Sequence, residues 1–183
     1  HAKGRGVQVT ISCACFVPKP HTPFQFVPMD TEESLQANRI NYLYGIMNGT
    51  TNYILSRMSR EGLEYEDVLR DAQRLGLAEP DPSTDVEGYD AAYKLSILAS
   101  LAFHGHVPFD FIHVEGITRV SQEDIRCGQE LGYTLKLLAI AKRDGMRVEA
   151  HVNPTFIPNN HPMANVSDAF NAVYLQGHAC GEM

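Results

Sequence analysis

Six charged side chains gather in one short segment, LGLAEPDPSTDVEGYDAAYK, which spans residues 75–94. Asp90 and Lys94 are four positions apart, so a helix places both on the same face. A carboxylate can hold an ammonium group, and a lysine can meet a carboxylate or give a proton to a carbonyl oxygen. The segment therefore predicts a site for a small zwitterion, and its charged residues are Glu79, Asp81, Asp85, Glu87, Asp90 and Lys94.

A plainer interpretation of the same segment is structural. Carboxylates at the start of a helix stabilise its dipole, and an Asp–Lys pair at i,i+4 is common on helix surfaces. Pro80 and Pro82 hold the residues before them in an extended conformation, whichever interpretation applies. The residues alone leave both open.

A second polar cluster, Asn48-Gly49-Thr50-Thr51-Asn52, precedes an apolar helical pattern. Exposed backbone N–H groups at a helix start can bind a carboxylate or a phosphate. A simple N-cap formed by Thr50 or Thr51 is the alternative.

No metal site is expected from the sequence. His104 and His106 are too close in sequence to share a helix face, and no HExxH or zinc-knuckle spacing occurs. A GxSxG elbow, which would indicate a serine nucleophile, is also absent.

The elements that must position these residues are helical in the first half of the chain. We expect an amphipathic piece over 31–39, a helix from about Tyr53 ended by Gly62, and another over 65–75 ended by Gly76. A long helix from Thr84 or Asp85 to Phe103 should then carry Asp90 and Lys94.

Strand patterns dominate elsewhere. Gly6 to Phe16 and residues 113–120 have strand character, and Asp144-Gly145 predicts a hairpin between strands over 134–143 and 146–157. A helix should begin at Ser121 and end at Gly132, residues 161–168 form a loop or short helix, and 171–177 a last strand. The predicted fold class is α+β, a mostly antiparallel or mixed sheet with helices packed on one face.

Composition narrows the possible functions. The 183 residues carry a net charge of -7, which argues against nucleic-acid binding, and no apolar run is long enough for a membrane span. Four cysteines without a disulfide pattern fit a reducing cytosol. No GxGxxG or P-loop occurs, so a complete nucleotide-binding domain is not expected. The chain begins at His1, and we expect a piece of a longer cytoplasmic protein.

Two motifs resemble one known family. GIMNGTTNYIL (45–55) and DAQRLGLAEPDPSTDVEGYDAAYKLSILA (71–99) are similar to the GxxNGTTNYIL and LGxAExDPxxDxxGxDxxxK patterns of homoserine dehydrogenase. Later segments, among them LGYTLKLLAIA and HPMANVSDAFNAVYLQG, also resemble that family. The resemblance covers about residues 36–183.

The resemblance implies the interconversion of L-aspartate 4-semialdehyde and L-homoserine with NADP or NAD, in threonine, methionine and isoleucine biosynthesis. It implies that residues 1–183 are the substrate-binding and dimerisation domain of a homodimer, with 1–30 as a divergent segment and without the nucleotide-binding domain.

The family's site roles fall on matching positions. Lys94 resembles the proton donor to the aldehyde oxygen, and Asp90 the residue that contacts substrate and orients the lysine. Glu79 resembles the carboxylate that binds the substrate amino group, with Asp85 as a supporting acid. Gly76 matches a backbone position near the cofactor. The loop bordering substrate and nicotinamide matches Asn48, Gly49, Thr50 and Thr51.

Three departures limit the resemblance. The nucleotide-binding domain and its active-site lysine are absent, and Met183 comes just before the family's GxGAG segment. Residues 12–30 lack the Glu and glycines that hold a monovalent cation in the family, which argues against a cation site here. We therefore expect the isolated chain to be inactive. The alternative is a non-enzymatic amino-acid-sensing or dimerisation module derived from the same family.

Overall fold

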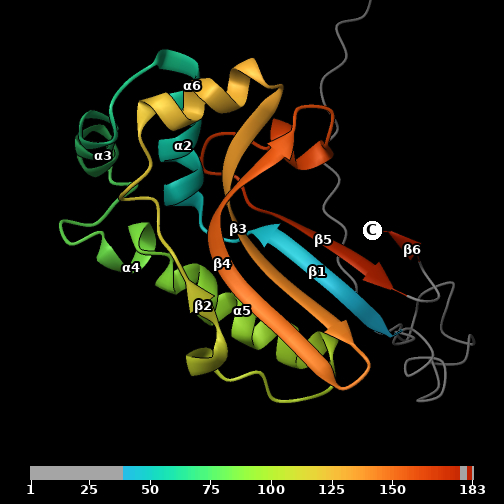
Figure 1. Ribbon diagram of the computed structural model, residues 1–183. Coiled ribbons are helices and arrows are strands. Elements are labelled where there is room, and N and C mark those ends of the chain that lie inside the picture. Colours follow the sequence, from blue (N-terminus) through green and yellow to red (C-terminus); the bar gives the residue numbers. More distant parts are fainter. Residues whose placement is uncertain (1–38, 178–180, 183) are drawn as a thin grey trace, which may run out of the picture. The chain divides into compact units, whose positions relative to one another are not determined.

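The computed structural model describes residues 39–177 and 181–182. The expected strand over 6–16, the proline-rich stretch after it and most of the expected helix over 31–39 lie outside these residues. What the structure describes is a mixed sheet covered by helices, which confirms the predicted α+β class (Figure 1).

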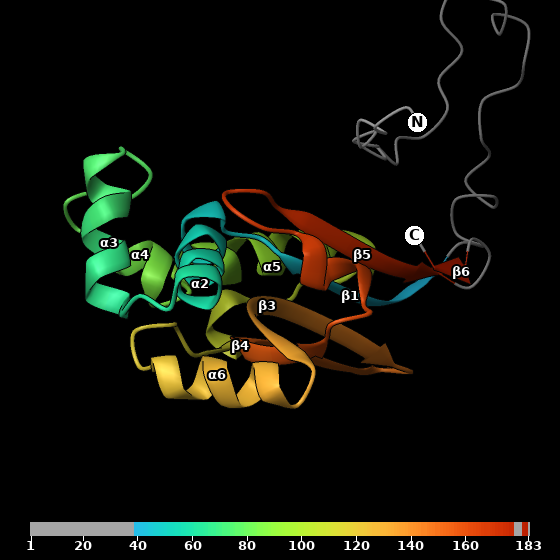
Figure 2. The same cartoon turned by 90° about the horizontal axis from the view of Figure 1, so that it is seen from above.

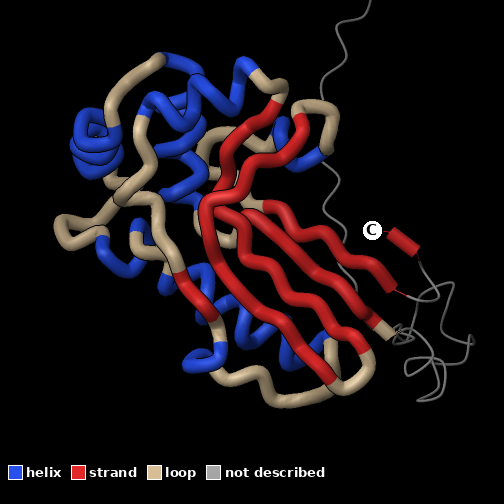
Figure 3. Tube along the Cα trace, in the orientation of Figure 1, coloured by secondary structure: helices blue, strands red, loops and turns tan. Residues whose placement is uncertain are grey.

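The sheet has six strands in the order β2-β4-β3-β1-β5-β6, drawn as the red tube in Figure 3. Only β2 and β4 run parallel, and the other neighbours are antiparallel. The strands are β1 (Ile40–Ile46), β2 (His113–Val114), β3 (Tyr133–Asp144), β4 (Arg147–Pro158), β5 (Ala172–Gly177) and β6 (Gly181–Glu182).

Five α-helices accompany the described sheet. In Figures 1 and 2, α3 and α4 lie on the left and β5 and β6 on the right, with α2 between them. No helix among the described residues has the length and apolarity needed to cross a membrane. The helices are α2 (Gly49–Glu61), α3 (Tyr65–Arg74), α4 (Ser83–Val86), α5 (Tyr89–Ala102) and α6 (Gln122–Glu130), with 3-10 turns η1 (Phe109–Phe111) and η2 (Pro162–Asn165).

The alternation of side chains along β3 divides the core in two. Leu135, Leu137 and Ala139 pack in the larger cluster, which includes the apolar faces of α2, α3, α5 and α6. Leu138 points to the other face, where it joins a smaller cluster with Ile157 and others. The helices therefore cover the face that carries the larger core.

Several predicted boundaries are confirmed. Gly62 caps α2 in the left-handed conformation, at a φ of 67°, and Gly132 follows α6 at a φ of 82°. Ser121 caps α6, and β3 and β4 form the hairpin at Asp144-Gly145 with Asp144 opposite Arg147.

The predicted long helix from residue 84 or 85 to 103 is wrong. Two helices, α4 and α5, replace it, and Gly88 separates them at a φ of 85°. A side chain there would be strained by this conformation and also crowded, because a Cβ on Gly88 would lie 3.2 Å from Val114 Cγ1. The break lets Asp85 and Asp90 approach the same point from different helices.

The predicted strand over 113–120 is also wrong beyond Val114. After Glu115 donates its N–H to the Val152 carbonyl, the chain leaves the sheet, and the Ile117 N–H donates instead to the Val86 carbonyl at 2.7 Å. Gly116 allows this contact, since a Cβ there would lie 2.2 Å from Val86 O. The segment therefore holds α4 in place instead of extending the sheet.

Strand β1 was not anticipated. It is a central strand, paired with β3 on one side and β5 on the other. Its end at Ile46 leads directly through Met47 and Asn48 into α2, so it delivers the predicted polar cluster to the carboxyl end of a buried strand.

Candidate active site

The site begins at Asn48, the N-cap of α2. Its backbone is extended, and its side-chain Oδ1 accepts the Thr51 N–H at 2.8 Å. This satisfies one of the free donors of the first helical turn. The prediction that Thr50 or Thr51 forms the cap is wrong, because Asn48 does. Asn48 is 5% exposed, so its remaining polar atoms also need partners.

Two carboxylates supply those partners. Asn48 Nδ2 donates to Asp85 Oδ1 at 2.7 Å and to Asp90 Oδ2 at 2.9 Å. Asp85 belongs to α4 and Asp90 to the first turn of α5. One amide thus holds together two acids that come from different helices.

Lys94 continues the chain of contacts. Its Nζ donates to Asp90 Oδ2 at 2.6 Å and to the Met47 carbonyl at 3.0 Å. An ammonium group has three N–H donors, so a third is left for another acceptor. The Lys94 side chain is 47% exposed, which leaves it accessible from solvent. The predicted i,i+4 pairing of Asp90 and Lys94 is confirmed.

The two threonines fix the neighbouring backbone. Thr51 Oγ1 donates back to the Asn48 carbonyl at 3.1 Å, and Thr50 Oγ1 donates to the Leu77 carbonyl at 2.8 Å. The second bond ties the start of α2 to the loop between α3 and α4. Gly49 lies close to another segment, since a Cβ there would be 2.7 Å from Ala169 O.

The loop between α3 and α4 carries Gly76 and Glu79. Gly76 has a φ of 73°, and a Cβ on this residue would meet no atom within 4 Å. Glu79 is exposed, and its backbone carbonyl accepts a hydrogen bond from Gln73 Nε2 at 3.2 Å. On the same loop, hydrogen bonds from Ser83 hold the pKa of Asp81 below its usual range.

The structure therefore joins four of the predicted residues, Asn48, Asp85, Asp90 and Lys94, by hydrogen bonds. It sets Glu79 and Gly76 on an adjacent loop, tied to the others through Thr50. The Met47 carbonyl was missed, and no sequence signal could reveal it, because every residue has such a group. Lys136, which contacts Asn52 of the predicted polar cluster, was not assigned a role; the signal was a lysine inside an apolar strand pattern.

Within residues 39–177 and 181–182 no three His, Cys, Asp or Glu side chains come together as a metal ligand set. Residues 12–30, where the family's cation site would lie, are outside the described part, so that expectation stays a prediction. A cavity of about 530 Å³ between β2 and β4 shares no lining residue with the Lys94 cluster.

Comparison with known proteins identifies relatives of the chain. The family model described as homoserine dehydrogenase matches residues 28–183. The homoserine dehydrogenase of Bacillus subtilis is 50% identical over 151 residues, and that of Corynebacterium glutamicum 46% over 155. Each alignment covers 82% of this chain and 35% of the relative.

Solved structures of homoserine dehydrogenases also match the chain. A homoserine dehydrogenase from Thiobacillus denitrificans matches with a TM-score of 0.79 and 50% identity, over 82% of this chain and 35% of that one. A hyperthermophilic archaeal homoserine dehydrogenase in complex with NADPH matches with a TM-score of 0.67 and 26% identity, over 82% and 42%.

The sequence and the fold thus match one part of proteins that are dehydrogenases. The chain belongs to the homoserine dehydrogenase family, and it spans about a third of the length of the curated relatives it matches.

Proposed function

We propose that this chain supplies the substrate-binding and proton-donating part of a homoserine dehydrogenase. The reaction interconverts L-aspartate 4-semialdehyde and L-homoserine, in the biosynthesis of threonine, methionine and isoleucine. The observation that carries the proposal is the hydrogen-bonded series Lys94–Asp90–Asn48–Asp85.

Lys94 acts as the general acid. As hydride adds to the aldehyde carbon, the carbonyl oxygen gains negative charge and takes a proton from the Lys94 ammonium, giving the alcohol. Asp90 and the Met47 carbonyl fix two of the three N–H donors, which aims the third at the substrate oxygen. In the reverse direction the neutral amine takes the proton back.

The carboxylates bind the amino group of the substrate. Glu79 is exposed beside the cluster, so its side chain can turn toward an ammonium group without breaking a buried contact. Asp85 and Asp90 keep Asn48 in place and add negative charge, while Gly49, Thr50 and Thr51 border the substrate from the start of α2.

NADP or NAD, when bound, supplies or accepts the hydride. The fit of this chain to the cofactor rests on Gly76, whose open, left-handed backbone leaves room for a group to approach. The remaining cofactor contacts belong to a nucleotide-binding domain outside this chain.

A second copy of the chain is the proposed partner, in the cytoplasm. Tyr42, Ile140 and Tyr174 belong to the smaller core cluster, on the sheet face away from the helices, and are only partly buried. Light scattering on the 183-residue chain should give twice its mass of 20.3 kDa. A stable monomer at micromolar concentration would contradict the dimer without affecting the assignment of the site.

The test of the site is a two-dimensional NMR titration with L-homoserine, and L-threonine is the comparison ligand. We expect saturable shifts of the Glu79, Asp90 and Lys94 amides with homoserine only. Glu79→Gln should weaken binding, whereas Glu130→Gln, at the exposed end of α6, should not.

Two results would overturn the proposal. One is the absence of any response to homoserine, alone and with a relative's nucleotide-binding domain added. The other is selective binding of threonine, which would favour the amino-acid-sensing alternative.

A further inference from the structure

Lys136 is a buried cation that forms no ion pair with a carboxylate in the part of the chain that the structure describes. It lies on β3, is 2% exposed, and takes part in none of the ion pairs found among residues 39–177. Its Nζ donates instead to Asn52 Oδ1 at 3.0 Å and to the Val166 carbonyl at 2.6 Å. A buried charge is costly, so an apolar residue would serve the core better. Packing alone does not explain this lysine.

Its partner Asn52 links two parts of the chain. Asn52 lies in the first half of α2, is 1% exposed, and its Nδ2 donates to the carbonyls of Val166 and Phe170 at 3.1 and 3.0 Å. Lys136 and Asn52 therefore share the Val166 carbonyl and also contact each other. Three segments, β3, α2 and residues 166–170, meet at this point.

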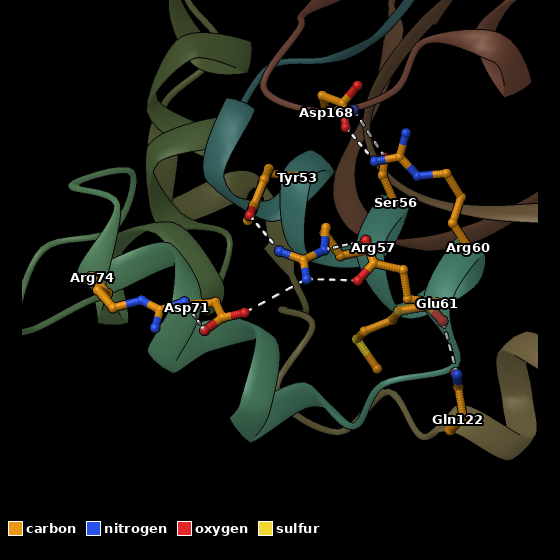
Figure 4. A network of polar contacts seen from close by, with 10 residues as sticks. Tyr53, Ser56, Arg57, Arg60, Glu61, Asp71, Arg74, Gln122 and Asp168 are labelled. Atoms are coloured by element: carbon orange, nitrogen blue, oxygen red, sulfur yellow. Dashed lines mark hydrogen bonds and ion pairs between the residues drawn. The ribbon is translucent and has the colours of Figure 1, made fainter.

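Asp168 anchors the middle of the same segment. It pairs with Arg60 near the end of α2, and its N–H donates to Ser56 Oγ at 3.2 Å (Figure 4). Its φ of 60° is unusual for a residue with a side chain, so the surrounding contacts hold it there. The segment thus follows α2 from its middle back toward its start.

At the start of α2 the segment reaches the site. The Ala169 carbonyl lies so near Gly49 that a Cβ on Gly49 would be 2.7 Å from it. Gly49 follows Asn48, the residue that holds Asp85 and Asp90. A shift of residues 166–170 would therefore displace Gly49, which is the residue next to the N-cap Asn48.

We propose that Lys136 is a positioning residue, which together with Asn52 fixes Val166–Phe170 against the first turn of α2 and thereby sets the position of Asn48–Thr51. The role in binding rests on the proposed function, whereas the fixing of the segment does not. The charge state of Lys136 is compatible with this role. Burial is the main cause that lowers the pKa of Lys136 to about 8; Arg60 also lowers this pKa, and Asp168 raises it. At neutral pH the ammonium form still predominates and donates to both oxygens.

The test compares Lys136→Met with Lys142→Met in the 183-residue chain. Lys142 lies on the same strand but is exposed. The measurements are amide hydrogen exchange, read in residues 166–170 and 49–52 against the β3–β4 hairpin, and homoserine affinity by NMR. For Lys136→Met we expect exchange in both segments to rise about ten- to a hundredfold and homoserine binding to weaken about tenfold, with the hairpin unchanged. Lys142→Met should match the wild type.

A second variant covers the case in which Lys136→Met does not fold. Asn52→Ser removes the amide that joins Val166 and Phe170, and the same local rise in exchange is expected. Unchanged exchange at 166–170 in the folded variants would overturn the proposal, as would a uniform rise over the whole sheet, which indicates a general role in stability. If the wild type itself does not respond to homoserine, the proposed function fails, and the exchange data still decide whether Lys136 fixes the segment.

Discussion

Both the oxygen and the nitrogen of the Asn48 side chain form hydrogen bonds. Its oxygen caps α2, and its two N–H groups go to Asp85 and Asp90. Aspartate at this position could cap the helix but would repel both acids, and serine has no second donor. The side chain thus couples the stability of α2 to the arrangement of the site.

We expect Asn48→Ala to lower the free energy of unfolding by about 1–2 kcal/mol, through loss of the cap, and to weaken homoserine binding. Ser121→Ala is the matched control, since Ser121 caps α6 and touches none of the site residues. It should cost a similar amount in urea denaturation and leave binding intact. If the two variants bound homoserine equally well, Asn48 would have no role in binding.

Lys94→Met in the intact enzyme should lower kcat by about 10²- to 10⁴-fold, the usual contribution of a positioned proton donor. KM should change less, because the proposed binding mode assigns the amino group of the substrate to carboxylates and not to Lys94. Steady-state kinetics with Lys142→Met as control measure this. Near-normal turnover would show that another group is the acid.

Spacing in the sequence predicted the Asp90–Lys94 contact, because i,i+4 geometry is local. It did not predict that Asn48 would join them, since 42 residues separate Asn48 from Asp90. The resemblance of the motifs placed Asn48 beside the substrate, but it did not predict this hydrogen bond. The link to Lys136 crosses 84 residues and had no motif to mark it.

At the scale of elements, the break at Gly88 shapes the site most. The apolar periodicity of residues 85–103 continues through the glycine, so pattern alone favours one helix. The chain turns at Gly88 with a φ of 85°, and the space beside it is limited by Val114, which the local pattern does not show. Glycines 62 and 132 were read correctly, because they end their apolar patterns.

Gly88→Ala should destabilise the chain more than Gly132→Ala. Both glycines have a φ above 80°, so each alanine meets a conformational cost of about 1–2 kcal/mol. A Cβ on Gly132 meets nothing within 4 Å, whereas one on Gly88 is crowded by Val114. Thermal and urea unfolding give the difference, and equal losses would show that the crowding is relieved at no cost.

Strand β1 was missed because its pattern is weak. INYLYGI contains a glycine and follows a helical pattern without a turn signal. Gly45 is nevertheless needed, as a Cβ there would lie 2.6 Å from Ala172 O on the neighbouring strand. A close approach between strands far apart in sequence is invisible to local propensity.

At the scale of the whole molecule, Lys136 should make stability depend on pH. The folded state releases this proton near pH 8, and the unfolded lysine releases it near 10.5. Between these values the unfolded chain binds more protons, so raising the pH favours the folded state. From pH 7.5 to 9.5 the free energy of unfolding should gain about 1–2 kcal/mol from this group.

Lys136→Met should remove that gain, measured as the difference between the two urea titrations. The comparison stops at pH 9.5 because a second group titrates above it: burial raises the pKa of Tyr65 to about 12. Tyrosines of this kind lower stability once the unfolded side chains ionise near pH 10. A gain of the same size in the variant would assign the effect to other groups.

The fold class was predictable because helices fill the first half and a hairpin the second. The order of strands was not, since it depends on pairing between the two halves. The parallel pair β2–β4 in particular joins strands on either side of α6.

The position of β1 also bears on how the chain folds during synthesis. Both of its neighbours, β3 and β5, lie more than 80 residues downstream, so β1 leaves the ribosome long before either can pair with it. At about 5–20 residues per second, the strand waits several seconds with its apolar residues unpaired. The helical segment between Gly49 and Ala102 is synthesised in that interval, and β1 cannot be paired on both edges until β5 has emerged.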